Sequence, residues 1–189
     1  PEPEEKGAAI KVQQEGDSII IETSLAGLNV DSLALTIMHE GKVEEFREFS
    51  SRITIHHSQL KVGIHQATVF DVHGRVFADR LFFVRKAEKE EPTLAVSGMK
   101  DEYSPYEKVE LKVKGKRRNV PVSLSIHDGY QSDPLFDSGN IMTEMLLSSE
   151  IKGFIPNPDW YFEKDDEEHR QALDLLMMTQ GWRRFVWRD

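Results

Sequence analysis

Residues 63–84 read GIHQATVFDVHGRVFADRLFFV, and this stretch decides the fold. Two runs rich in β-branched and aromatic residues, Gly63–Phe70 and Arg75–Val84, flank the short connection Asp71-Val72-His73-Gly74. Two such runs around a short connection that ends in Gly predict an antiparallel β-hairpin. The first half of the chain therefore contains an antiparallel sheet.

More strands are predicted upstream of this hairpin. The consecutive residues Ile19, Ile20 and Ile21 are β-branched, which is typical of a strand inside a sandwich. The upstream strands are expected at 9–13, 18–24, 32–39, 42–49 and 52–56. About seven strands in ~80 residues, without helical periodicity, predict an immunoglobulin-like antiparallel β-sandwich over residues 9–86.

A second strand series follows a charged linker. Residues 85–92 read RKAEKEEP, and we place the linker at 87–92 because charged, Pro-terminated stretches separate domains. Strands are expected at 93–98, 109–113 and 120–127. The sequence therefore predicts an all-β chain of two immunoglobulin-like sandwich domains, at 9–86 and 93–189, after a flexible stretch at 1–8.

One helix is predicted near the end of the second domain, at about 165–181. Asp165 is a suitable N-cap, Glu168 lies three residues later, and an acidic first turn favours the helix dipole. Gly181 is placed to be the residue after the helix end. The helix belongs to an apolar block, LDLLMMTQGWRRFVW at 173–187, whose surface must be buried against the domain, against a missing neighbour or against a partner.

Aromatic and arginine side chains in this region are the candidate interaction residues. An aromatic–Arg cluster can be a binding hot spot, or it can stack Arg on Trp inside the domain's own core, which we favour. Trp160 and Tyr161 could line a sugar-binding surface, although a cover for the second sandwich is the simpler interpretation. The full set is Trp160, Tyr161, Trp182, Arg183, Arg184, Phe185 and Trp187.

Candidate metal ligands are sparse. One loop supplies oxygen ligands of the kind that Ca²⁺ prefers, but their spacing misses the EF-hand pattern, so turn chemistry is the first interpretation. The residues are Asp128, Asp133, Asp137 and Asn140. Asp165, Asp166, Glu168 and His169 could share a helix face, and we assign them to helix initiation. The histidines of the first domain, His39, His56, His57, His65 and His73, are expected on surfaces or in turns.

Composition excludes several function classes. The chain has no Cys, which rules out a thioester, a thiol nucleophile and disulfides within it. The formal charge of −9 is spread over both halves and disfavours nucleic acid as a partner. No apolar run reaches the ~18 residues of a membrane span. No nucleophile elbow or phosphate-binding loop is present, so we expect no enzyme activity and no cofactor.

Several motifs together resemble a family. The closing hairpin 63–84, the opening Tyr103-Ser104-Pro105-Tyr106 with Val109, and the strand at 120–128 resemble macroglobulin-type domains. The segment at 146–162 and the block at 173–185 are similar to large cell-envelope proteins of Bacteroidetes. Such proteins carry macroglobulin-like domains together with TonB-dependent-receptor plug or carboxypeptidase-regulatory-like domains. The resemblance implies a macroglobulin-type fold and a periplasmic or outer-membrane-associated location.

The expected function follows from this context. We expect a non-catalytic module of a larger envelope protein, acting as a scaffold or interaction element and linked to TonB-dependent uptake. Its partners would be other domains of the same parent and envelope proteins. The start PEPEEKG and the abrupt end at Asp189 suggest a piece of a longer chain. Two alternatives stay open: a protease-interacting macroglobulin-like protein with an exposed loop at 129–140, or a carbohydrate- or peptide-binding domain.

Overall fold

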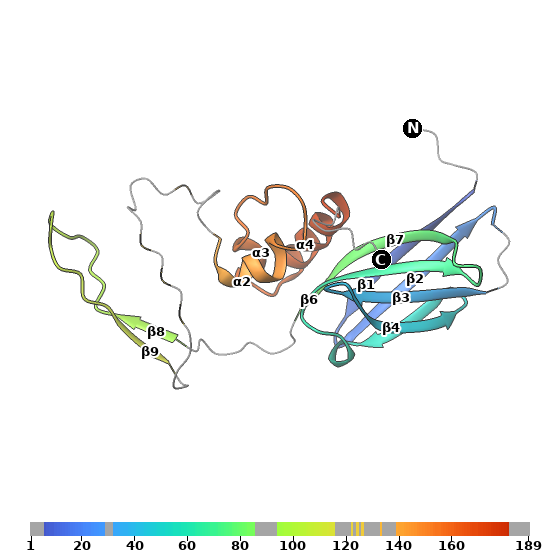
Figure 1. Ribbon diagram of the computed structural model, residues 1–189, viewed down its shortest axis with the longest axis horizontal. Helices are drawn as coiled ribbons and strands as arrows, with labels where there is room; N and C mark the ends of the chain where they lie inside the picture. The colour runs from blue at the N-terminus through green and yellow to red at the C-terminus, as the bar shows by residue number, and fades with distance from the viewer. Residues whose placement is uncertain are drawn as a thin grey trace. The chain divides into compact units, whose positions relative to one another are not determined.

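The computed structural model describes residues 6–28, 32–85, 94–115 and 139–181, with the single residues 122, 124, 126 and 133. Contacts divide the chain into two units (Figure 1). The first unit combines residues 1–87 with 128–189, and the second is residues 88–127. The chain is mostly antiparallel β-sheet with a few helices.

Two antiparallel sheets make up the N-terminal part of the first unit. The three-stranded sheet has the order β1 (Gly7–Glu15), β2 (Ser18–Ala26), β5 (Arg52–His56). The four-stranded sheet has the order β4 (Lys42–Phe49), β3 (Leu33–His39), β6 (Gly63–Asp71), β7 (Val76–Val84). All seven strands lie within a few residues of their predicted positions, because each carries its own β-rich run.

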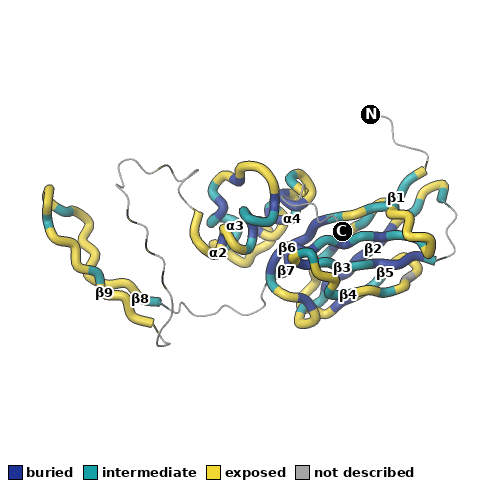
Figure 2. The backbone as a smooth tube through the Cα atoms, viewed as in Figure 1, coloured by how far each residue is buried: buried dark blue, intermediate teal, exposed yellow. Residues whose placement is uncertain are grey.

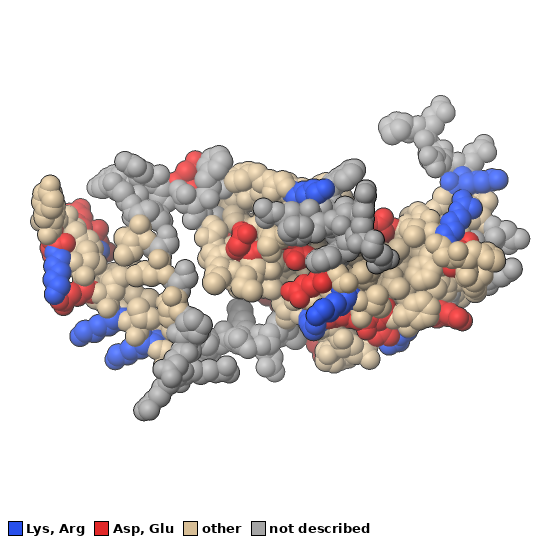
Figure 3. All heavy atoms as spheres, in the orientation of Figure 1, with Lys and Arg blue, Asp and Glu red and all other residues tan. Residues whose placement is uncertain are grey.

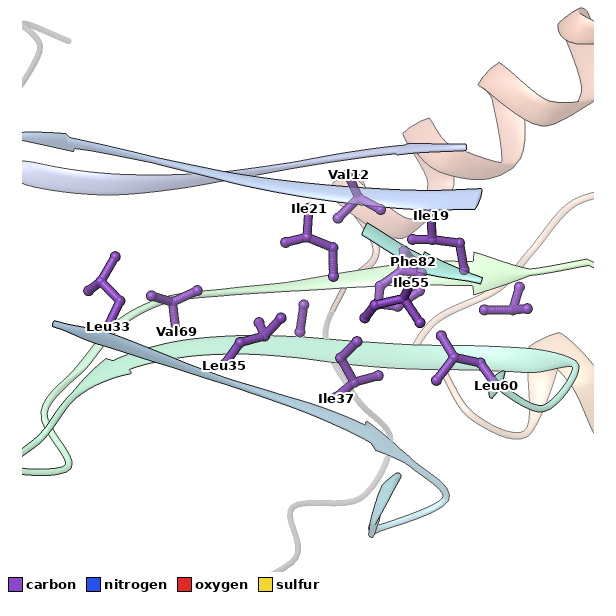
Figure 4. Close-up of a cluster of buried hydrophobic side chains, with 12 residues drawn as sticks. Val12, Ile19, Ile21, Leu33, Leu35, Ile37, Ile55, Leu60, Val69 and Phe82 are labelled. Atoms are coloured by element: carbon purple, nitrogen blue, oxygen red, sulfur yellow. The ribbon is translucent and has the colours of Figure 1, made fainter. Parts of the chain in front are cut away.

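The two sheets pack face to face as a β-sandwich. Alternate residues of each strand point inward, so Ile19 and Ile21 of β2 meet Leu35 and Ile37 of β3 (Figure 4). All four are fully buried or nearly so. Phe82 of β7 is the largest fully buried side chain of this core. The core therefore fixes which face of every strand looks outward.

Helical segments cover part of the outer face of the four-stranded sheet. They are α2 (Ile141–Thr143), which continues into a π-helical turn at Glu144–Ser148, then α3 (Trp160–Glu163) and α4 (Glu167–Thr179). A second apolar cluster joins them to the strands. Its buried members are Ile64, Leu81, Phe83, Leu147, Ile151, Ile155, Leu173, Leu176 and Met177.

The helical block therefore packs on the first sandwich, whereas we expected it to close the second. The physical reason lies in β7, where Leu81 and Phe83 alternate with the core residues Phe82 and Val84. A strand with apolar residues on both faces needs a cover on its outer side. The sequence RLFFV contains this signal, but it does not say which helix provides the cover.

Helix α4 has a different N-cap from the one predicted, whereas Gly181 follows the C-cap residue Gln180, as predicted. Asp166, not Asp165, is the N-cap, and its Oδ1 accepts the His169 backbone N–H at 3.0 Å. Asp165 instead pairs with Arg170, whose Nε lies 2.8 Å from Oδ1. Gly181 has no left-handed φ. It is needed for space, because a Cβ there would lie 2.6 Å from the Met177 carbonyl oxygen.

The described part of the second unit is a two-stranded sheet. β8 (Leu94–Ser97) pairs antiparallel with β9 (Lys112–Gly115). The first strand was predicted, whereas the second lies three residues beyond the start expected at Val109. Most of the strand predicted at 120–127 lies outside the described residues. The second sandwich stays a prediction.

Candidate functional site

Ion pairs and hydrogen bonds hold the helical block on the sandwich. The Nη2 of Arg80 on β7 lies 2.7 and 2.6 Å from the two carboxylate oxygens of Asp174 on α4. Strand β7 ends at the core residue Val84, and Arg85 follows it directly. Arg85 donates to the carbonyl oxygens of Tyr161 at 2.6 Å and Lys164 at 3.2 Å. Burial lowers the pKa of Arg85, although Asp165 opposes that shift.

A small cavity lies at this junction, where the edge strand β1 approaches β7 and α4. Its volume is about 240 Å³. Gln14 crosses from β1 and donates to the Phe83 carbonyl oxygen at 2.6 Å. The cavity mixes apolar, basic and acidic side chains, and most of its charges already have partners. The lining residues are Val12, Gln13, Gln14, Glu15, Phe83, Arg85, Glu167, Arg170, Gln171, Leu173 and Asp174.

Trp160 and Tyr161, two predicted interaction residues, pack within the helical block. The Trp160 ring stacks on His169 with centroids 4.4 Å apart, and it meets Tyr161 edge to face at 5.4 Å. His169 is buried, and its Nδ1 lies 2.5 Å from Asp166 Oδ1. The hydrogen bonds from His169 lower the pKa of Asp166. Both aromatic residues are half-buried, and their contacts are those of a helix-packing cluster.

The other predicted site residues are only partly described. Trp182, Arg183, Arg184, Phe185 and Trp187 lie outside the described residues, as do Asp128 and Asp137. Asn140 caps α2, since its Oδ1 accepts from the Met142 and Thr143 backbone at 2.9 and 3.1 Å. Its Nδ2 donates to Asp159 at 2.6 Å. Of the four predicted Ca²⁺ ligands the structure describes Asp133 and Asn140, and the Asn140 side chain serves as a helix cap.

Two histidines expected at the surface are buried in the sandwich. His39 and His65 stack with ring centroids 4.6 Å apart, between the core residue Phe82 and the β3–β4 turn. His65 Nε2 lies 3.0 Å from Glu44 Oε2, and its Nδ1 lies 3.1 Å from the Gly63 carbonyl oxygen. Alternation along β6 places His65 on the inward face with Ala67 and Val69, a signal present in the sequence.

These groups shift one another's ionisation. Burial lowers the pKa of His65 more than the hydrogen bond to Glu44 raises it. Burial acts to raise the pKa of Glu44, but hydrogen bonds from His65 and Lys61 outweigh burial and leave that pKa lowered. Both ring nitrogens of His65 face acceptors, so only the doubly protonated ring can donate to both. Protonation of His65 on β6 therefore changes its hydrogen bonds to Glu44 on β4 and to the Gly63 carbonyl oxygen.

The β8–β9 sheet has one open apolar face. Val96 and Val113 stand directly opposite each other and are 55% and 44% exposed. Leu94 is two residues from Val96, and Leu111 is two residues from Val113, so alternation assigns both leucines to the same face as the valines. The other face carries Ala95, Ser97, Lys112 and Lys114. None of residues 94–115 is buried (Figure 2). Of Val109, Leu111 and Val113, which were predicted to alternate along one strand, only Val113 lies in β9, and none of the three is buried.

Neither the surface charges nor the candidate metal ligands of the described residues mark out a further site. Basic and acidic side chains are interspersed on the face shown in Figure 3. In the described part of the chain, no three His, Cys, Asp or Glu side chains gather as a metal-binding group. Within the same residues, no helix is long and apolar enough to cross a membrane.

Comparisons with known proteins give no match by sequence and a weak likeness to a solved structure. No family model matches the chain, and no curated protein matches it. The crystal structure of Ruminococcus gnavus beta-glucuronidase in complex with uronic isofagomine is similar at 9% sequence identity and a TM-score of 0.30. The match covers 58% of this chain and 17% of that chain. A TM-score of this size does not establish a shared fold.

Proposed function

We propose that this chain is a non-catalytic scaffold and interaction module of a larger bacterial envelope protein. In this proposal the sandwich and its helical block form a rigid platform. Residues 88–127, which the sequence inserts between the two halves of that platform, present the interaction surface. The observation that carries the proposal is the open apolar face of Val96 and Val113 on a unit whose described residues 94–115 are all accessible.

The platform is supported by long-range contacts. Arg80 and Asp174 are 94 residues apart in sequence, and Arg85 reaches Tyr161 across 76 residues. The sequence therefore inserts residues 88–127 between two segments of one folded unit.

The open face supports an interaction role on energetic grounds. A two-stranded sheet is at best marginally stable in water by itself, and it needs further strands or a packing partner. Exposed apolar patches of this kind mark interaction sites. In an immunoglobulin-like or macroglobulin-type domain, a second sheet would cover this face. The partner we propose is therefore β-rich and belongs to the parent protein or to an envelope assembly.

The cellular context rests on the resemblance to macroglobulin-like envelope proteins of Bacteroidetes. We propose a periplasmic or outer-membrane-associated location and a link to TonB-dependent uptake. The strand order β1-β2-β5 and β4-β3-β6-β7, with sequential strands exchanged between two sheets, supports an immunoglobulin-like topology for the first sandwich.

Site-specific photo-crosslinking tests the proposal. A photoreactive amino acid replaces Val113 in the parent protein produced in its natural host, and crosslinked products are identified by mass spectrometry. We expect crosslinks to another domain of the parent or to an envelope protein. The matched control is Lys112, the neighbouring residue on the polar face. Equal crosslinking from both positions, or none from Val113, would contradict an interaction role for this face.

A further inference from the structure

Two sheet edges border the cavity beside α4. β1 is the outermost strand of the three-stranded sheet, and β7 is the outermost strand of the four-stranded sheet. The cavity is lined by Phe83 of β7 and by four consecutive residues of β1, 12–15. Consecutive side chains on a strand point to opposite faces, so a cavity that touches all four residues borders the edge of β1 rather than one face.

This edge of β1 has no neighbouring strand among the described residues, because β1 pairs with β2 alone. The edge of β7 is satisfied in part by a side chain. Gln14 Nε2 donates to the Phe83 carbonyl oxygen at 2.6 Å, where a neighbouring strand would place a backbone N–H. Unpaired backbone groups along a sheet edge are a template for a further strand.

Helix α4 supplies another wall of the cavity. The spacing of its lining residues, i, i+3, i+4 and i+7, puts them on one helix face. They are Glu167, Arg170, Gln171 and Asp174. This face extends over about 10 Å of helix axis, and four residues of β1 extend over about 13 Å. The two walls are therefore similar in length and match an extended segment of about four residues.

The cavity has an apolar floor and a polar rim. Val12, Phe83 and Leu173 line it and are buried. Glu15 and Gln171 line it and are exposed. The cavity is thus accessible from solvent along its rim, and a chain that enters it covers apolar side chains at the floor.

Charge defines the kind of segment that fits. The two arginines of the lining share the carboxylate of Asp165, and Asp174 pairs with Arg80. Glu15 and Glu167 have no ion pair within the described residues, and Glu167 accepts from a neutral amide. These lining residues and their direct partners comprise four carboxylates and three guanidinium groups. A cationic segment therefore suits the cavity better than an anionic one.

We propose that a basic, extended peptide of a partner protein adds to β1 as a further strand, between β1 and the charged face of α4. Its backbone pairs with the free edge of β1, and its Lys or Arg side chains meet Glu15 and Glu167. Strand addition of this kind takes its affinity from backbone hydrogen bonds and its specificity from side-chain contacts.

The size of the cavity favours a peptide over a compact ligand. Its volume of about 240 Å³ is below the roughly 300–1,000 Å³ of small-molecule pockets, whereas a peptide can continue past both ends of the cavity. All the lining residues belong to the first unit. The surface is therefore additional to the β8–β9 face, and its test does not depend on that face.

Synthetic peptides test strand addition on the full chain. The probe is a fluorescein-labelled peptide of about eight residues that alternates Val and Lys. One control peptide carries N-methyl groups on its amides, which removes the backbone donors and keeps every charge. A second control has Glu in place of each Lys. We expect the Val–Lys peptide to bind, and both controls to bind about tenfold more weakly in fluorescence anisotropy.

Variants of the chain locate the site. Gln171→Trp fills the cavity from its helix wall, and Leu175→Trp is the matched control, because Leu175 is exposed on the same helix outside the lining. We expect Gln171→Trp to weaken binding about tenfold and Leu175→Trp to leave it unchanged. Glu167→Gln should weaken binding about two- to fivefold, and Glu48→Gln, at an exposed position of β4, should not. Thermal unfolding shows that each variant is folded.

Four outcomes would overturn the proposal. Equal binding of the N-methylated peptide would mean that charge alone attracts the probe, without strand pairing. Equal binding of the Glu peptide would remove the preference for basic side chains. Unchanged binding in Gln171→Trp would place the peptide elsewhere on the chain. No binding of the Val–Lys peptide at about 1 mM would show that the edge of β1 does not accept a strand.

Discussion

A single guanidinium nitrogen of Arg80 bridges both carboxylate oxygens of Asp174, and this contact fastens α4 to the last strand of the sandwich. The Arg80 side chain is only 12% exposed, while that of Asp174 is 43% exposed. A buried charge that loses its partner destabilises the folded state more strongly than an exposed one. The pair is thus an anchor whose removal should be measurable.

Replacing Asp174 with Ala should lower the free energy of unfolding by about 1–3 kcal/mol, because Arg80 would stay largely buried without its acceptor. Denaturant unfolding of Arg80→Ala, Asp174→Ala and the double variant gives the coupling energy between the two residues. We expect about 0.5–3 kcal/mol of coupling. Fully additive effects would show that the contact does not hold the helix.

Two neighbouring leucines of α4 test the helix-on-sheet core. Leu173 is buried against the four-stranded sheet, whereas Leu175 is exposed. Leu173→Ala should cost about 2–5 kcal/mol through lost packing and the cavity left behind. Leu175→Ala should change stability by less than about 0.5 kcal/mol. Similar losses for both variants, measured by thermal or denaturant unfolding, would argue against the docked position of α4.

The His39–His65 stack depends on a glycine beside it. A Cβ at Gly63 would lie 2.9 Å from His39 Cε1, and the Gly63 φ is +129°. Gly63→Ala should therefore destabilise the sandwich by about 1–3 kcal/mol. Gly7→Ala is the control, because a Cβ there has no atom within 4 Å. If the two alanine variants unfold at the same denaturant concentration, Gly63 is not required for space.

Acid should weaken the sandwich through His65. Because burial lowers the folded-state pKa of His65 below its ordinary 6.5, the unfolded chain binds more protons between these two values. This contribution is present above about pH 6.5 and is lost as the pH falls through the lowered pKa. Glu44, whose pKa is also lowered, contributes a further loss at more acidic pH.

Denaturant unfolding between about pH 8 and pH 5.5 measures the His65 contribution. Stability should fall with pH in the unmodified chain and fall less steeply in His65→Gln. His56→Gln is the control, since His56 is exposed on the outer side of β5. A pH dependence that is unchanged in His65→Gln would place the acid-sensitive group elsewhere.

The sequence predicts the elements of this chain better than it predicts their assembly. β-Branched alternation is a local signal, and it located all seven strands of the first sandwich within a few residues. The partner of the α4 helix is a non-local property. Leu81 and Phe83 show that β7 needs an outer cover, but an apolar stripe such as Leu173, Leu176 and Met177 fits any apolar face.

In the candidate sites, too, local features could be predicted from the sequence and long-range contacts could not. The inward position of His65 follows from its alternation with Ala67 and Val69, although His was expected at the surface. The roles of Arg80 and Arg85 could not be read from the sequence, because their partners lie 76 to 94 residues away. Trp160 and Tyr161 were found as aromatic candidates, and their packing on His169 and on each other is a result of the fold.

Hydrogen exchange under increasing denaturant tests the central claim, that the helical block and the first sandwich form one folding unit. The account predicts that amides of α4 and of β6–β7 open with the same free energy and the same denaturant dependence. Amides of residues 94–115, none of which is buried, should exchange with much less protection. If α4 instead opens together with residues 94–115 while β6–β7 stays protected, the helical block belongs to the second unit and the account is wrong.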